Sequence, residues 1–331
     1  MKRTLMRALV TLLALISGTT AKASGFQQVS IAVPGDRPLI AGIWYPSDSP
    51  LTARFFGVHR AMLAVGGAVR GTGLPLVVIS HGSGGAFYSL FPTAIALADA
   101  GFVVAAVSHT GDSGQDRSRR LEVIDRPLHM TRLIDYMLRE WRQRQAIDAA
   151  RVGIIGYSVG AFTALVAAGG EPDLRRVAPH CAAYPQDPVC RFVRGSDVDA
   201  YELNAATGKP WAHDSRIKAA VLAAPALAFV FGRDGLANVK VPIQLWRGDA
   251  DASLPEPFYA ETLLHDLPVK PEYHVVANGN HLAYLPPCQA AVAWMYPVMC
   301  DNAPGFDRAA FNGQFNAEVL RFFRAQFGMA Q

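Results

Sequence analysis

Short apolar runs alternate with amphipathic stretches along most of this 331-residue chain. Nearly uninterrupted apolar runs of this length are typical of parallel strands that are buried on both faces. We therefore predict strands at residues 76–80, 102–107, 152–157, 219–222, 243–246 and 273–276. Longer stretches with helical patterning separate them, and we predict helices near residues 90–100, 128–144, 159–168, 257–267 and 307–327. This alternation predicts an α/β fold with a doubly wound, mostly parallel sheet.

Two segments depart from the alternation. Residues 26–33 and 39–45 flank the turn Pro34-Gly35-Asp36, which predicts an antiparallel hairpin at the start of the domain. Residues 171–215 form a longer connection than a simple crossover needs, so we predict an insertion over the carboxyl edge of the sheet, where such folds bind ligands. An inert surface excursion is the alternative. Residues 24–331 show no internal repeat or linker, and we predict a single domain.

The first 23 residues have the pattern of a secretory signal peptide. Basic residues at positions 2, 3 and 7 precede an apolar run at 8–16, and Ala21-Lys22-Ala23 supplies the small residues of a cleavage site. The apolar run has about half of the roughly 20 residues that a membrane-spanning helix needs. We therefore expect cleavage after Ala23 and an exported protein, periplasmic or secreted. The alternative is a membrane anchor, which the short run disfavours.

The charge balance argues against a polyanionic partner. Four of the 31 basic residues lie in the predicted signal peptide, so the rest of the chain has 27 basic and 27 acidic residues. A chain this close to neutral lacks the excess positive charge that is typical of proteins that bind nucleic acid or attach to membranes through a polybasic segment. Arg117, Arg119 and Arg120 form a dense basic cluster, and the acidic residues beside it predict a solvated loop. These patterns carry no signal for an oligomeric state.

Four cysteines occur as two local pairs, Cys181 with Cys190 and Cys288 with Cys300. In an exported chain such pairs predict two short-range disulfides. The alternative is a metal site, which usually needs closely spaced cysteines or histidines in register. His180 adjoins Cys181, but no second ligand pair follows at that spacing, so we expect no metal.

The strongest chemical signal is Gly156-Tyr157-Ser158-Val159-Gly160, which lies between a predicted strand and a predicted helix. This is the context of a nucleophile elbow, in which a strained turn projects the serine hydroxyl above the sheet. Side chains two residues before and after the serine would collide with neighbouring backbone, and glycine at 156 and 160 removes them. The motif therefore predicts Ser158 as a nucleophile; a plain turn is the alternative.

A serine nucleophile needs a histidine base, and the base needs a carboxylate that orients it. In chains with this elbow the acid and then the histidine lie downstream. His281 fits best, because it lies in a loop just after the last predicted strand, whereas His274 lies inside that strand. Asp251 is the predicted acid, since it follows a glycine by three positions at a strand end, and Asp249 is the alternative. The remaining downstream histidines are His180, His213 and His265.

Acyl transfer also needs N–H donors for the oxygen that becomes negative. One predicted donor is the backbone N–H of Val159, directly after the nucleophile. The second should come from the glycine-rich loop His81-Gly82-Ser83-Gly84-Gly85 after the strand at 76–80, and we predict the Ser83 N–H, with Gly82 as the alternative. His81 precedes the nucleophile in the chain, which favours a role in bracing the loop.

With these residues placed, the chain resembles the dienelactone-hydrolase-like branch of the α/β hydrolases and is similar to bacterial relatives of platelet-activating-factor acetylhydrolase. The resemblance implies hydrolysis of a carboxylic ester through an acyl-enzyme, with no metal or organic cofactor. Dienelactone hydrolases carry a cysteine nucleophile, so Ser158 moves the interpretation toward serine esterases. The shared features are Ile43-Trp44-Tyr45-Pro46, Ser80-His81-Gly82-Ser83-Gly84, Ser108-His109-Thr110-Gly111-Asp112, the elbow at Ser158, Gly248 to Asp251, and His281.

In that family the segment His109 to Asp112 lies near the rim of the pocket, which implies a contact with substrate; a strand-end turn capped by Asp112 is the alternative. We expect the substrate to be a small-molecule or lipid-like ester. An amidase or peptidase would use the same three residues. A secreted binding protein that keeps the fold without catalysis is the alternative from another class.

Overall fold

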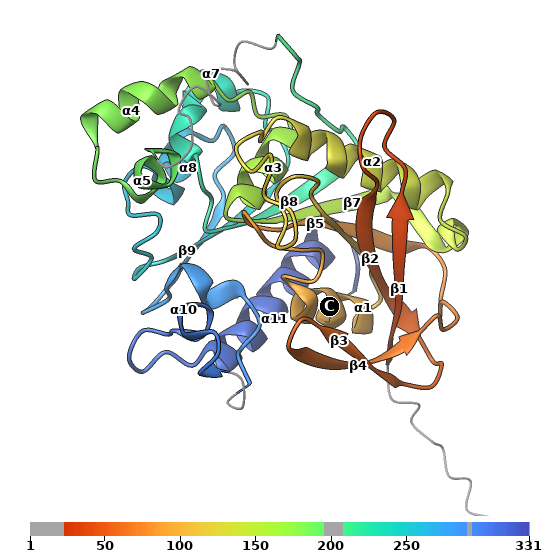
Figure 1. The fold of residues 1–331 in the computed structure, drawn as a ribbon. Coiled ribbons are helices and arrows are strands. Elements are labelled where there is room, and N and C mark those ends of the chain that lie inside the picture. Colours follow the sequence, from red (N-terminus) through yellow and green to blue (C-terminus); the bar gives the residue numbers. More distant parts are fainter. Residues whose placement is uncertain (1–22, 195–207, 290–292, 331) are drawn as a thin grey trace, which may run out of the picture.

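The computed structural model describes residues 23–194, 208–289 and 293–330. Within these residues ten strands form a sheet with the order β10-β9-β8-β7-β5-β6-β2-β1-β4-β3 (Figure 1). The strands are β1 (Ala23–Ile31), β2 (Leu39–Ser47), β3 (Thr52–Phe56), β4 (His59–Val65), β5 (Leu74–Ser80), β6 (Val103–Ser108), β7 (Ile147–Tyr157), β8 (Ile217–Ala223), β9 (Ile243–Gly248) and β10 (Glu272–Val276). The principal helices are α1 (Phe91–Asp99), α2 (Asp125–Arg139), α3 (Val159–Ala167), α4 (Val177–Ala183), α5 (Pro188–Arg194), α7 (Gly232–Leu236), α8 (Ala260–Asp266), α10 (Pro297–Cys300) and α11 (Arg308–Gln326).

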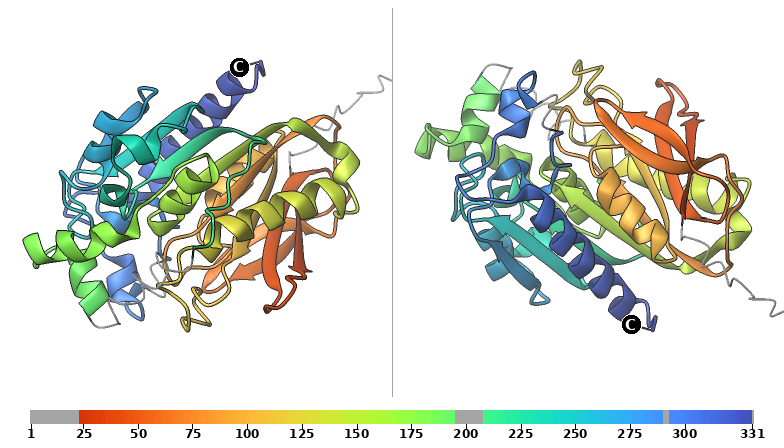
Figure 2. Two further views of the ribbon diagram at one scale, coloured as in Figure 1. Left: turned by 90° about the horizontal axis from the view of Figure 1, so that it is seen from above. Right: turned by 90° about the horizontal axis from the view of Figure 1, so that it is seen from below.

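The centre of the sheet is parallel and covered on both faces, as the apolar runs predicted. β6, β5, β7, β8, β9 and β10 pair in parallel, and every residue of β5 is buried. Helices α2, α3 and α8 pack on one face, whereas α1 and α11 pack on the other (Figure 2). The doubly wound α/β fold is therefore confirmed, because two apolar faces require two layers of helices.

The predicted N-terminal hairpin is confirmed, since β1 and β2 pair antiparallel from Ala23–Ser47 to Ile31–Leu39. A second hairpin, β3 with β4, was missing from the sequence prediction. It lies at the sheet edge, and most side chains of β3 are exposed, as with Phe55 at 61%. An edge strand that buries so little lacks the continuous apolar run on which the prediction relied.

Two helices differ from their predicted bounds. The helix predicted at 128–144 begins at Asp125 and ends at Arg139, after which Trp141 turns back and is buried. The helix predicted at 257–267 begins only at Ala260. Glu256 explains that start, because its carboxylate accepts the backbone N–H groups of Tyr259, Ala260 and Glu261 and so caps the first turn.

The segment predicted as an insertion contains the short helix η2 (Leu174–Arg176), α4 and α5 before residue 195. The Cys181–Cys190 disulfide joins α4 to α5. The predicted signal peptide falls on residues 1–22, which lie outside the described residues, and Ala23 is the first residue of β1. Among the described helices, none is both long enough and apolar enough to span a bilayer.

Candidate active site

Ser158 lies in a strained turn between β7 and α3. Its φ of 56° and ψ of −123° place it in a region that non-glycine residues rarely adopt. A Cβ atom at position 156 would overlap the carbonyl oxygen of Gly160, and one at position 160 would overlap that of Ser80. Glycine is therefore required at both positions, as the elbow motif predicted, and the turn holds the hydroxyl above the carboxyl edge of the sheet.

Ser158, His281 and Asp251 form one hydrogen-bonded chain, although they come from three separate segments. His281 Nε2 lies 3.0 Å from Ser158 Oγ, and His281 Nδ1 lies 2.8 Å from Asp251 Oδ2. Asp251 is buried after β9, and its other oxygen accepts the N–H groups of Ser253 and Leu254. A carboxylate that accepts Nδ1–H leaves Nε2 free to accept the serine proton.

The alternative acid and bases have other partners. Asp249 Oδ1 accepts the backbone N–H of Asn278 at 2.7 Å, which is the turn-capping role of a carboxylate. His274 stacks on the ring of Trp246 with centroids 3.9 Å apart. His213 Nε2 lies 3.3 Å from the carbonyl oxygen of Gly170. None of these side chains reaches Ser158 by any contact among the described residues.

The loop after β5 lies directly against the elbow. A Cβ atom at Gly82 would come within 3.2 Å of Ser158 Cβ, so this glycine permits a close approach. The N–H of Gly84 is engaged by the Asp112 carboxylate at 2.7 Å. Within the described part of the chain, the N–H groups of Ser83 and Val159 have no protein acceptor. The Ser83 N–H on the loop and the Val159 N–H at the start of α3 are therefore both able to donate to an oxygen bound beside Ser158.

A buried ion pair, Asp112–Arg126, holds this loop, and sequence reasoning missed it. Asp112 accepts the Gly84 N–H and the Ser83 hydroxyl (3.0 Å) and pairs with Arg126 Nη1 at 2.7 Å. Arg126 also donates to the carbonyl of His81 and, at 3.1 Å, to Thr163 on α3. The pair thus ties the loop after β5 to the helix that begins at the elbow.

His109 and Asp112 do not contact the cavity directly, although Asp112 binds Ser83 and Gly84, which line it. Both of these side chains are buried, with 0% and 2% exposure, and neither lines the cavity above Ser158. Asp112 binds the neighbouring loop instead of capping its own turn. The sequence does offer one signal for the pair. Asp112 follows one predicted strand, and Arg126 precedes the next predicted helix, so the two opposite charges stand at the two ends of one strand-to-helix connection.

A cavity of about 450 Å³ opens above Ser158. Its walls are mostly apolar, and α5 contributes Pro188, Val189 and Phe192, so this part of the predicted insertion is not an inert excursion. Arg117 and Arg120 also line it, and the Arg120 guanidinium lies 4.5 Å from the Phe192 ring centroid. The predicted solvent-exposed basic loop is confirmed, since Arg117 is exposed and Arg120 is partly exposed, but the sequence did not indicate that both residues also line the cavity. The further lining residues include Val123, Leu227, Leu254, Leu282, Leu285 and Met299.

A model of the prolyl oligopeptidase family matches residues 88–287, a range that contains Ser158, Asp251 and His281. The chain belongs to the prolyl oligopeptidase family. A model of platelet-activating factor acetylhydrolase, isoform II, matches residues 54–120 of this family member, including the loop after β5. A search among curated protein sequences gave no match.

Solved structures similar to this prolyl oligopeptidase family member show the same fold at low sequence identity. A ferulic acid esterase from Streptomyces cinnamoneus is 18% identical over 94% of this chain and 92% of its own, with a TM-score of 0.61. A dienelactone hydrolase-like promiscuous phosphotriesterase from metagenomic libraries is 13% identical over 92% and 99%, with a TM-score of 0.53. A puromycin-hydrolyzing peptidase from Mycobacterium tuberculosis is 15% identical over 92% and 40%, with a TM-score of 0.55. The α/β-hydrolase fold is confirmed by these likenesses.

Both predicted disulfides are present in this α/β hydrolase. Cys181 bonds to Cys190, and Cys288 bonds to Cys300. The second bridge closes a segment beside His281, since Asn280 donates to the carbonyl of Asp301 at 3.1 Å. It therefore tethers the region from which the histidine is presented.

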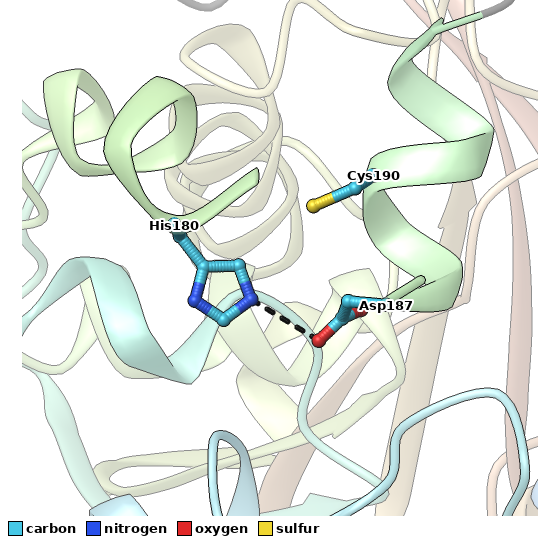
Figure 3. A group of neighbouring side chains, drawn as sticks. All are labelled: His180, Asp187 and Cys190. Atoms are coloured by element: carbon cyan, nitrogen blue, oxygen red, sulfur yellow. Dashed lines mark hydrogen bonds and ion pairs between the residues drawn. The ribbon is translucent and has the colours of Figure 1, made fainter. Parts of the chain in front are cut away.

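His180, Asp187 and Cys190 form a close group of potential metal ligands (Figure 3). The disulfide occupies the sulfur of Cys190, so that atom is not a thiolate ligand. His180 on α4 points to Asp187 at 3.1 Å, and Tyr259 donates its hydroxyl to the same carboxylate at 2.6 Å. Asp187 also accepts the N–H of Val189 and so caps α5. The group fixes the helix that forms one wall of the cavity.

Three buried histidines surround the Asp112–Arg126 pair. His81 Nδ1 donates to the Gly82 carbonyl at 2.6 Å, and its Nε2 accepts the His109 N–H at 3.0 Å, so His81 braces the loop as expected. Burial lowers the pKa of His81 to about 3 and that of His129 to about 4, and the positive charge of Arg126 lowers them further. Burial likewise places the pKa of His109 well below its ordinary value.

Because these histidines stay neutral in the folded protein, stability is expected to fall in mild acid. An unfolded histidine takes up a proton near its model value of 6.5, whereas folded His81 and His129 do so only near 3 and 4. Between those values the unfolded state binds more protons. The free energy of unfolding therefore falls as the pH falls, by about 1.4 kcal/mol per pH unit for each such histidine. Urea denaturation at neutral pH and at about pH 5 measures this loss.

His129→Gln and His265→Gln form a matched pair of variants for this test. His265 is exposed on α8, so its replacement should leave the acid-induced loss of stability unchanged. His129→Gln removes one group that titrates in the unfolded state alone, so this variant should lose about 2 kcal/mol less than wild type over the same interval. An equal loss in both variants would show that the buried histidines do not govern acid sensitivity.

Proposed function

We propose that the protein is an exported serine hydrolase that cleaves carboxylic esters through an acyl-enzyme. The observation that carries the proposal is the contact chain from Ser158 Oγ through His281 to Asp251, at the base of an apolar cavity. Export is supported by the signal-like N-terminus and by two disulfides, which form in oxidising compartments. No step of this reaction calls on a metal or an organic cofactor.

In the proposed reaction, Ser158 Oγ attacks the ester carbonyl carbon while His281 Nε2 takes its proton. The negative oxygen of the tetrahedral intermediate is bound by the N–H groups of Val159 and Ser83; each such donor typically contributes about 10²–10³ in rate. His281 then protonates the departing alcohol, and the acyl group stays on the serine. Water, deprotonated by His281, then attacks the acyl-enzyme; the bond to Ser158 Oγ breaks, His281 returns the proton to that oxygen, and the carboxylic acid is released. Asp251 holds the histidine in the required tautomer throughout.

Ester substrates are favoured by the match with the ferulic acid esterase, which spans nearly the whole of both chains. The apolar cavity above Ser158 fits a small-molecule or lipid-like acyl group. The match to the prolyl oligopeptidase family supports a second candidate, hydrolysis of a peptide or another amide with the same residues.

Matched nitrophenyl esters and nitroanilides, graded by acyl length, separate the two candidates. For the same acyl group we expect kcat/KM for the ester to exceed that for the anilide by about 100-fold, which corresponds to about 2.7 kcal/mol of activation free energy. A fluorophosphonate probe should label Ser158 and abolish turnover of both. Equal or faster turnover of the anilides would assign the protein to the amidases.

A further inference from the structure

Large apolar side chains are exposed next to the catalytic cavity. Trp294 is 77% exposed and Val298 is 78% exposed, and three neighbours in the same short segment are roughly half exposed. We call this group the apolar rim; it consists of Trp294, Met295, Tyr296, Val298 and Met299. It includes Val298 and Met299 of α10, which lies on the lower left of the molecule in Figure 1. No charged residue occurs anywhere in positions 282–300 of the sequence.

The segment that carries the apolar rim is tethered to the rest of the domain at its C-terminal end. The Cys288–Cys300 disulfide closes its segment, and Arg308, itself buried, donates to the carbonyl oxygens of Met299 (2.8 Å) and Asp301 (2.6 Å). Exposed apolar area costs about 25 cal/mol per Å² relative to burial, and contiguous exposed apolar patches usually mark interaction sites. A tethered segment that keeps such side chains in water therefore points to a docking surface.

The apolar rim is continuous with the mouth of the catalytic cavity. This continuity indicates which kind of partner binds the rim. Met299 belongs to the rim and also lines the cavity, and Phe192, 40% exposed on α5, lines the same cavity. Among the described residues that line the cavity, two are arginines, Arg117 and Arg120, and none is a carboxylate. A protein docked on the rim would close this mouth. A lipid surface that contains esters would instead supply substrate directly to the cavity. The positive charges of the arginines would attract anionic headgroups.

We propose that the apolar rim docks this protein on the surface of an aggregated ester lipid that contains anionic headgroups. The proposal rests on the proposed esterase function, because it assigns the physical state of the substrate for that same site. Tryptophan and tyrosine suit a lipid–water boundary, since each has an apolar body and a polar tip. Docking places the cavity mouth against the lipid, so an ester chain enters without crossing water.

One double variant and one single variant test the docking surface. In Trp294→Ser/Val298→Ser the most exposed apolar side chains of the rim are removed, and neither lines the cavity. Phe55→Ser is the matched control, because Phe55 is 61% exposed on β3, in a different part of the sheet. Binding is measured by sedimentation with phosphatidylcholine vesicles that contain phosphatidylglycerol. Activity is measured on a soluble short-chain nitrophenyl ester and on an emulsified long-chain ester.

We expect the rim variant to bind the vesicles at least about tenfold more weakly than wild type, while Phe55→Ser binds normally. The rim variant should keep the wild-type rate on the soluble ester and lose about tenfold on the emulsion. Ser158→Ala should bind the vesicles fully and hydrolyse neither ester. Vesicle binding without any ester hydrolysis by wild type would overturn the proposed function and leave the docking surface standing.

Three results would overturn the docking proposal itself. The first is wild-type protein that hydrolyses the soluble ester but does not sediment with the vesicles. The second is a rim variant that sediments as wild type does. The third is sedimentation-velocity data in which wild type is a dimer and the rim variant a monomer, because the rim would then be an interface between two copies of this chain.

Discussion

Replacing Ser158 by alanine is expected to lower kcat for ester hydrolysis about 10⁶-fold while the fold remains intact. The hydroxyl is the atom that forms the acyl-enzyme in the proposed reaction, and the amides of Val159 and Ser83 alone supply only a small residual rate. The methyl group of alanine fits the space that the serine side chain leaves. Steady-state kinetics with a nitrophenyl ester, together with circular dichroism, measure both parts of this expectation.

Ser253→Ala is a suitable control, since Ser253 also lines the cavity but makes no contact with His281 among the described residues. It should keep most of the wild-type activity. If purified Ser158→Ala retained more than a few per cent of activity, another group would have to be the nucleophile. A fluorophosphonate adduct on a different serine would lead to the same reassignment.

The second large effect is expected at Asp251. Asp251→Asn should lower kcat about 10⁴-fold, because the amide no longer favours the tautomer of His281 whose Nε2 accepts the serine proton. KM should change little, since the residue lies behind the histidine and does not line the cavity. The measurement is kcat as a function of pH for wild type and variant.

Asp249→Asn provides the matched comparison, because Asp249 stands two positions earlier at the end of the same strand. Among the described residues its carboxylate binds only the backbone N–H of Asn278, so we expect a change of less than about threefold in kcat. The reverse ranking of the two variants would assign the orienting acid to Asp249 and would require the loop after β9 to rearrange in solution.

Much of the central fold follows from local pattern. The strands at 76–80 and 152–157 were predictable because both faces of a parallel sheet must be apolar, and this leaves an uninterrupted run in the sequence. The elbow was predictable because its steric demands fall within five consecutive residues. The positions of Asp251 and His281 were predictable because strand ends at one sheet edge meet in space.

Features that depend on long-range partners were not predictable. The β3–β4 hairpin buries few side chains, so it leaves little apolar pattern. Arg117 was assigned to a solvated loop because its charge is locally balanced, whereas its position over the cavity depends on how the loop after β6 folds back. The exposure of Trp294 and Val298 has the same origin, since an apolar segment gives no sign of whether its side chains face the core or water.

The sequence by itself determined the doubly wound sheet, the elbow, the disulfide partners and the residues that stand at the strand ends. Each of these depends on periodicity or on short spacing, which a linear chain records directly. Only the tertiary structure decided that Asp112 and Arg126 form the buried pair that links the loop after β5 to α3. It also decided that α5 and the apolar rim flank the cavity. Those relations join residues far apart in the chain, and their free energy exists only once both partners are removed from water together.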